Sequence, residues 1–124
     1  APETDETRGI LDAAALARLE DGAVVINVGR GRLVVLDDLV AELRRGRIRG
    51  AGLDVFPREP LPEDHPLWTL PNVLLTPHVS AVTHAFWERE GDLILHNLRC
   101  FLEGADPWSP ETRWRNVVDK EAGY

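Results

Sequence analysis

Three short apolar runs, each followed by a loop that carries a polar residue, constrain the fold of this chain most strongly. They cover residues 23–28, 51–56 and 73–75. The first run is rich in β-branched residues and has no polar residue before Asn27, which is typical of a strand buried on both faces of a parallel sheet. Helical patterns alternate with these runs through short connections, and this order predicts the α/β class.

Helical patterns with capping signals accompany the runs. Each is delimited by a residue that commonly starts a helix or by a glycine that commonly ends one. The predicted helices cover residues 13–19 (capped by Asp12), 38–45 (capped by Asp37 and ended by Gly46), 65–70 (a single turn) and about 83–101 (stopped by Gly104). The apolar positions of the last helix follow a helical period, although Asn97 interrupts the stripe.

Charge and hydropathy disfavour two classes of partner. The 124 residues carry a formal net charge of -7, whereas nucleic acids and anionic membranes both require a basic surface. The one basic cluster, residues 44–49, is expected to be a solvated helix C-terminus. No apolar run approaches the ~20 residues of a membrane span. We therefore expect neither nucleic acid nor membrane as a partner.

The single cysteine and the spacing of the histidines bear on redox setting and metals. Cys100 is alone, so no intrachain disulfide can form, and a reduced, cytoplasmic setting fits. It lies in the stripe of the last helix and is expected to be a small core residue. The histidines have neither HxxxH nor HExxH spacing, so we expect no metal site.

Arg30, Glu59 and His78 follow the three apolar runs, at the strand ends where open α/β sheets bind ligands. Gly29 and Gly31 flank Arg30, so backbone amides can approach a ligand while the guanidinium offers a planar fork for a carboxylate. A carboxylate beside an imidazole orients the ring and favours its protonated form, which is a positioned general acid. Taken singly, each residue could equally be a solvated or structural group.

Asp54 is a separate candidate, because it lies within the second apolar run. A buried carboxylate must find a hydrogen-bond donor, and a ligand amide would supply one.

Four motifs in order resemble the C-terminal part of the D-isomer-specific 2-hydroxyacid dehydrogenases. They are Pro2-x-Thr4-x-x-Thr7-x-Gly9, Gly22-Ala23-x-x-Ile26-Asn27-x-x-Arg30-Gly31, Gly52-x-x-Asp54-Val55-Phe56-x-x-Glu59-Pro60-Leu61 and Pro77-His78. Three shorter matches look most like the glyoxylate/hydroxypyruvate reductase A branch of that family. These are Pro60-Leu61-Pro62, His65-Pro66-Leu67-Trp68 and the ending Val118-Asp119-Lys120-x-x-Gly123-Tyr124.

The resemblance implies hydride transfer between NAD or NADP and a small 2-keto or 2-hydroxy acid, such as glyoxylate or hydroxypyruvate. Arg30 would bind the substrate carboxylate and polarise the carbonyl. Protonated His78 would donate a proton to the carbonyl oxygen, and Glu59 would hold it in that state. Asp54 would contact the nicotinamide amide. The cofactor-binding residues implied are Val28, Gly29, Arg30, Asp54 and His78.

The resemblance also implies a division of the chain. Residues 1–80 would be the second half of a Rossmann-like NAD(P)-binding domain, and residues 81–124 an interdomain helix with the C-terminal segment of the substrate domain. The Gly-x-Gly-x-x-Gly fingerprint does not occur in the sequence, and neither does methionine. We therefore expect a fragment of an enzyme that is a homodimer when intact. The alternative is a non-catalytic dimerisation or interaction module derived from the same fold.

Overall fold

The computed structural model describes residues 1–121, and the chain divides into two compact units. The first unit is Ala1–Ser80 and the second is Ala81–Tyr124. Gly123 and Tyr124, which close the last of the matching motifs, lie outside the described residues.

The first unit is built on a parallel sheet of three strands in the order β1-β2-β3, and this confirms the α/β class. Its strands are β1 (Ala23–Asn27), β2 (Ile48–Leu53) and β3 (Val73–Leu75). β2 begins three residues earlier than predicted, because Ile48 is fully buried although it stands inside the basic cluster. It also ends before Asp54, so the polar residues that follow belong to a loop.

Two helices precede and connect the first two strands. α1 (Ala13–Ala17) begins as predicted, with the Asp12 carboxylate accepting a hydrogen bond from the amide of Ala15 at 2.9 Å. It ends two residues earlier than predicted. A 3-10 turn, η1 (Gly31–Leu33), follows β1 and leads towards α2 (Leu36–Arg44).

The predicted cap of α2 is wrong. The helix starts at Leu36, so Asp37 lies in its first turn rather than before it. A negative charge in the first turn still favours the helix through its dipole. Asp38, in the same turn, accepts a hydrogen bond from the amide of Ala13 at 2.8 Å and so ties α2 to the start of α1.

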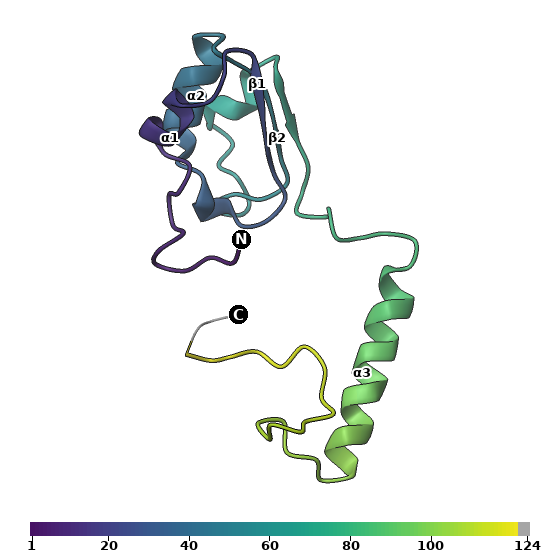
Figure 1. Cartoon of the computed structure of the whole chain (residues 1–124). Helices are drawn as coiled ribbons and strands as arrows, with labels where there is room; N and C mark the ends of the chain where they lie inside the picture. Colours follow the sequence, from purple (N-terminus) through teal and green to yellow (C-terminus); the bar gives the residue numbers. More distant parts are fainter. Residues whose placement is uncertain (122–124) are drawn as a thin grey trace. The chain divides into compact units, whose positions relative to one another are not determined.

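The core fills one face of the sheet only. α1 and α2 lie on the same side of the strands (Figure 1). Eleven buried side chains form one core cluster, which includes residues of both helices and of β1 and β2. On the other face Val24, Ile26 and Leu74 remain 45%, 71% and 68% exposed. The prediction that the first strand is buried on both faces is therefore wrong for this unit. The connections between neighbouring parallel strands are right-handed. Because the strands follow one another in the order β1-β2-β3, both connections lie on the same face of the sheet.

The second unit consists of α3 (Phe86–Leu102) and the segment that follows it. The predicted long helix is confirmed, and Gly104 follows its end with a left-handed φ of 70°. Asn97 exchanges two hydrogen bonds with the backbone of Arg115, both at 3.0 Å, which explains the polar residue in the stripe. Cys100 is buried, as predicted, whereas Ile94, Leu98 and Phe101 are exposed in this chain.

Candidate active site

The carboxyl ends of the three strands meet at one edge of the sheet. Asn27, Leu53 and Leu75, the last residues of β1, β2 and β3, are direct neighbours in the strand register. The loops that carry the candidate residues begin immediately after these positions. Three segments far apart in the sequence are therefore delivered to the same place.

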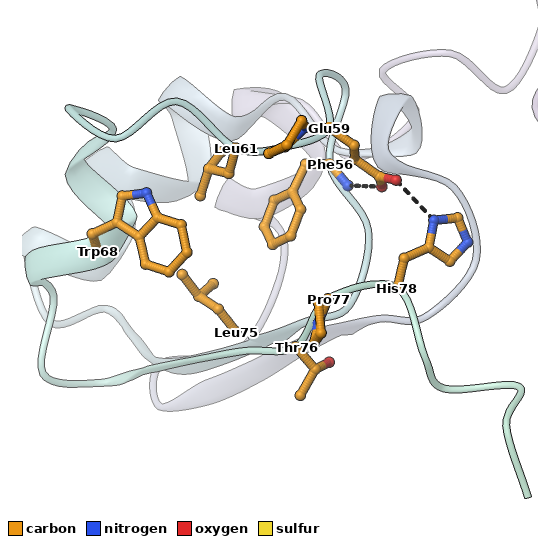
Figure 2. A pocket seen from close by; sticks show the side chains of 9 residues that line it. Phe56, Glu59, Leu61, Trp68, Leu75, Thr76, Pro77 and His78 are labelled. Atoms are coloured by element: carbon orange, nitrogen blue, oxygen red, sulfur yellow. Dashed lines mark hydrogen bonds and ion pairs between the residues drawn. The ribbon is translucent and has the colours of Figure 1, made fainter.

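Glu59 and His78 form a hydrogen-bonded pair at this edge. His78 Nδ1 lies 2.9 Å from one carboxylate oxygen of Glu59, and the amide of Phe56 donates to the other at 2.9 Å (Figure 2). The bond from His78 and then that from Phe56 lower the pKa of Glu59. With the ionised carboxylate accepting at Nδ1, the Nε2 nitrogen of the ring is left for a ligand.

Arg30 shares a cavity of about 290 Å³ with this pair. Its guanidinium donates to the carbonyl of Gly29 at 2.9 Å, and among residues 1–121 no carboxylate lies within ion-pair distance of it. The residues that line the cavity are Glu3, Arg30, Gly31, Arg32, Val55, Phe56, Pro57, Glu59 and His78. The cavity thus places a cation with spare donors beside an imidazole.

Two neighbours shape the loop of Arg30. Asn27 is only 7% exposed, and its side chain accepts from the amide of Gly29 at 3.1 Å and donates to the carbonyl of Arg30 at 2.9 Å. Gly31 lies directly against the backbone of Phe56 and Pro57, where a Cβ atom would overlap them. The first loop therefore rests on the loop that leads to Glu59.

Asp54 is the most deeply buried charged residue of the site, at 2% exposure. Its donors come from the chain itself. They are the hydroxyl of Thr76, the amide of Val79 at 3.0 Å and the amide of Ser80 at 2.8 Å. These bonds, that of Thr76 above all, hold the pKa of Asp54 well below its usual range. Its contact with a nicotinamide amide stays a prediction.

A larger apolar cavity of about 570 Å³ adjoins the pair on the side of Trp68. Phe56, Leu61, Trp68 and Leu75 form its apolar walls, and Glu59 and His78 close one end (Figure 2). The indole nitrogen of Trp68 donates to the carbonyl of Pro62 at 2.8 Å, which fixes the ring.

Several of these neighbours are not among the sequence-based site candidates. Glu3 and Arg32 pair at 3.6 Å on the wall of the smaller cavity, and Thr76 holds Asp54. Of these, only Thr76 carries a signal in the sequence, because it directly follows the third apolar run. Neither a cluster of three or more potential metal ligands nor a helix long and apolar enough to cross a bilayer occurs among residues 1–121.

The chemistry available at this edge follows from the three side chains. Arg30 can bind an anion through its fork of N–H donors. His78 can deliver a proton from Nε2, and its hydrogen bond to Glu59 orients the ring. Such a site suits a substrate with a carboxylate next to a group that gains a proton.

Known proteins resemble the chain along almost its whole length. A family profile described as "D-isomer specific 2-hydroxyacid dehydrogenase, NAD binding domain" matches residues 1–80. A glyoxylate/hydroxypyruvate reductase A from Klebsiella pneumoniae is 43% identical over 123 residues, which are 99% of this chain and 36% of that protein. A protein from Corynebacterium melassecola, uncharacterised and located in a proB 3' region, is 42% identical over 99% of this chain and 38% of its own length.

Solved structures of 2-hydroxyacid dehydrogenases are also similar to this chain in sequence and in fold. An NADPH-dependent glyoxylate/hydroxypyruvate reductase from Sinorhizobium meliloti, in complex with NADP and sulfate, is 40% identical and superposes with a TM-score of 0.83 over 100% of this chain and 38% of that one. A D-isomer specific 2-hydroxyacid dehydrogenase from Xanthobacter autotrophicus Py2, in complex with NADPH and MES, is 41% identical with a TM-score of 0.84 over 100% of this chain and 48% of that one. The chain spans little more than a third of the length of the curated relatives, 36–38%. It belongs to the D-isomer specific 2-hydroxyacid dehydrogenases, through their NAD-binding domain.

Proposed function

We propose that this chain carries the catalytic residues of an NAD(P)-dependent reductase that acts on a small 2-keto acid such as glyoxylate or hydroxypyruvate. The observation that supports this most is the Glu59–His78 pair, joined at 2.9 Å, on the wall of the cavity that Arg30 also lines. A 2-keto acid presents a carboxylate and a carbonyl oxygen on adjacent carbons, which are the two groups that this cavity can receive.

Arg30 binds the substrate carboxylate and, from the same side chain, polarises the carbonyl. A guanidinium is suited to this, because its planar donors match a carboxylate in two parallel hydrogen bonds. It also stabilises the negative charge that develops on the carbonyl oxygen.

His78 donates the proton. When bound, a reduced nicotinamide would supply the hydride for the carbonyl carbon. The carbonyl oxygen takes a proton from Nε2 of His78. The ring is left neutral, with Nδ1 still hydrogen-bonded to Glu59. Glu59 contributes by stabilising the imidazolium before the transfer and by fixing the orientation of the ring.

The residues at the sheet edge fit the nicotinamide end of a dinucleotide. Val28 and Gly29 follow β1 directly, and the side chain of Val28 is exposed, so both can lie along a ligand at the carboxyl ends of the strands. We propose Val28, Gly29, Arg30, Asp54 and His78 as the cofactor-binding residues. NADPH is the first cofactor to test, because the Sinorhizobium and Xanthobacter structures contain NADP or NADPH.

The organisation of the whole protein is also part of the proposal. Residues 1–80 would form the second half of the nucleotide-binding domain, and residues 81–124 an interdomain helix with part of the substrate domain. A homodimer and a cytoplasmic location stay predictions from the sequence. α3 exposes apolar side chains, among them Ile94 and Phe101. They favour the alternative of a non-catalytic interaction module only if the chain shows no turnover, either alone or within a complete reductase.

A chimera tests the proposal. The matching residues of the Klebsiella reductase are replaced by this chain, and the loss of NADPH and NADH absorbance is followed with hydroxypyruvate and with glyoxylate. The 124-residue chain, with its mass of 13.8 kDa verified, is assayed in parallel. Turnover by the chimera supports the proposal, whether or not the chain is active alone. A folded chimera that binds NADPH but does not oxidise it with either acid would overturn it.

A further inference from the structure

The deeply buried carboxylate of Asp54 faces the segment that carries His78. It is the first residue after β2, and it lines neither of the two cavities described above. A buried charge requires hydrogen-bond donors, since its desolvation is otherwise costly. Among residues 1–121, its hydrogen-bond donors all come from one short stretch, residues 76–80.

These donors lie on both sides of His78 in the sequence. On the N-terminal side, the hydroxyl of Thr76 donates to Oδ1 of Asp54. On the C-terminal side, the amide of Val79 donates to Oδ1 at 3.0 Å and that of Ser80 to Oδ2 at 2.8 Å. Asp54, directly after β2, therefore holds the chain before and after His78. Hydrogen bonds to an ionised acceptor are among the stronger ones in proteins.

The backbone of His78 has a conformation that needs such support. Its φ is +56°, in the left-handed region that residues with a Cβ atom adopt infrequently. A residue stays in such a region when the surrounding structure fixes it, and these positions concentrate at functional sites. Among residues 1–121 only Asn116 shares this feature outside the glycines.

We propose that Asp54 is a positioning residue for His78. By binding Thr76, Val79 and Ser80, its carboxylate fixes the left-handed turn and brings the imidazole to Glu59. The catalytic consequence rests on the proposed function, whereas the placement of His78 stands apart from it. In the chimera, Asp54→Asn should lower kcat by roughly a hundredfold, the cost of a reacting group displaced by about 1 Å.

The decisive experiment follows the carboxyl ¹³C signal of Glu59 through an acid titration of the 124-residue chain. The negative charge of Asp54 raises the pKa of Glu59, while the hydrogen bond from His78 lowers it and is the largest influence. Asp54→Asn removes that charge and one acceptor of the turn. If Asp54 acts through charge alone, the pKa of Glu59 falls. If Asp54 positions His78, the His78–Glu59 bond is lost and the pKa rises, as we expect. A fall, or no change, would overturn the proposal.

Thr76 supplies a matched pair of controls that keep the charge of Asp54. Thr76→Val removes the hydroxyl, and we expect it to raise the pKa of Glu59 and to speed amide exchange at Val79 and Ser80 by roughly tenfold. Thr76→Ser keeps the hydroxyl and should match the parent chain. Equal exchange in both variants would contradict the proposal.

Exchange at the β1–β2 amides reports whether each variant is folded, and if Asp54→Asn does not fold, the Thr76 pair decides. An inactive chimera with the expected Glu59 shifts would refute the proposed function and leave the positioning role intact.

Discussion

At Gly31 the loop of Arg30 meets the loop of Glu59. A Cβ atom there would overlap the carbonyl group of Phe56 and the nitrogen of Pro57, and both are backbone atoms that cannot rotate away. The two loops can approach this closely only because position 31 has no side chain. The distance between Arg30 and the Glu59–His78 pair thus depends on one glycine.

Gly31→Ala should destabilise the chain by about 1–3 kcal/mol, the usual cost of forcing extra atoms into a packed site. The midpoint of urea unfolding measures this. Gly91→Ala is the control, because a Cβ atom there meets nothing within 4 Å and alanine favours the interior of α3. An unchanged midpoint for Gly31→Ala would show that the loops do not depend on this contact.

The lowered pKa values of two carboxylates in the site predict that the native state loses stability at acid pH. Both Asp54 and Glu59 have a pKa that the fold lowers, so each stabilises the native state above its unfolded pKa of about 4 and loses that contribution as the pH falls through its folded pKa. The free energy of unfolding should be level between about pH 7 and 5 and fall below about pH 4. Urea titrations at several pH values measure it, and Asp54→Asn should reduce the slope. A stability that rises below pH 4 would contradict the assignment.

At the scale of elements, Arg47 connects α1, α2 and β2. Its guanidinium donates to the carbonyl of Leu19 at 2.9 Å and to that of Leu16, at the end of α1. Its Nε donates to the Glu42 carboxylate of α2 at 2.6 Å. The last carbonyls of a helix have no partner within it, so Arg47 satisfies groups that burial would otherwise leave unpaired. The basic cluster is thus partly structural rather than fully solvated.

Arg47→Ala should lower the melting temperature several times more than Arg45→Ala. Both residues pair with Glu42, but Arg45 is exposed, and the bonds to the carbonyls of Leu16 and Leu19 come from Arg47. Exposed ion pairs contribute little to stability, whereas unpaired buried carbonyls cost free energy. Thermal unfolding followed by circular dichroism compares the two variants. Equal shifts would mean that the bonds to α1 add nothing.

The sequence could predict which residues reach the site, but not what holds them. Arg30, Glu59 and His78 each follow an apolar run, and parallel strands end at one edge, so their convergence could be predicted. The donors of Asp54 lie 22 to 26 residues along the chain, and no local pattern specifies such a pairing. The start of β2 could not be predicted, because the charges around Ile48 are typical of a helix end.

At the scale of the whole molecule, the chain leaves apolar surface open in each unit. One face of the sheet is uncovered at Ile26 and Leu74, and α3 exposes Ile94 and Phe101. Large apolar surfaces of this kind normally lie in an interface. The chain spans 36–38% of the length of its curated relatives.

The most direct test of His78 as the proton donor is kcat/KM for hydroxypyruvate with NADPH, measured on the chimera and its His78→Ala variant. His84→Ala is the control, since that histidine is exposed and lines none of the described cavities. We predict that His78→Ala lowers kcat/KM by about 10²–10⁴-fold, the usual contribution of a positioned general acid, and that His84→Ala leaves it close to the parent value. Turnover by His78→Ala within a few-fold of the parent would contradict the assignment of His78 as the proton donor.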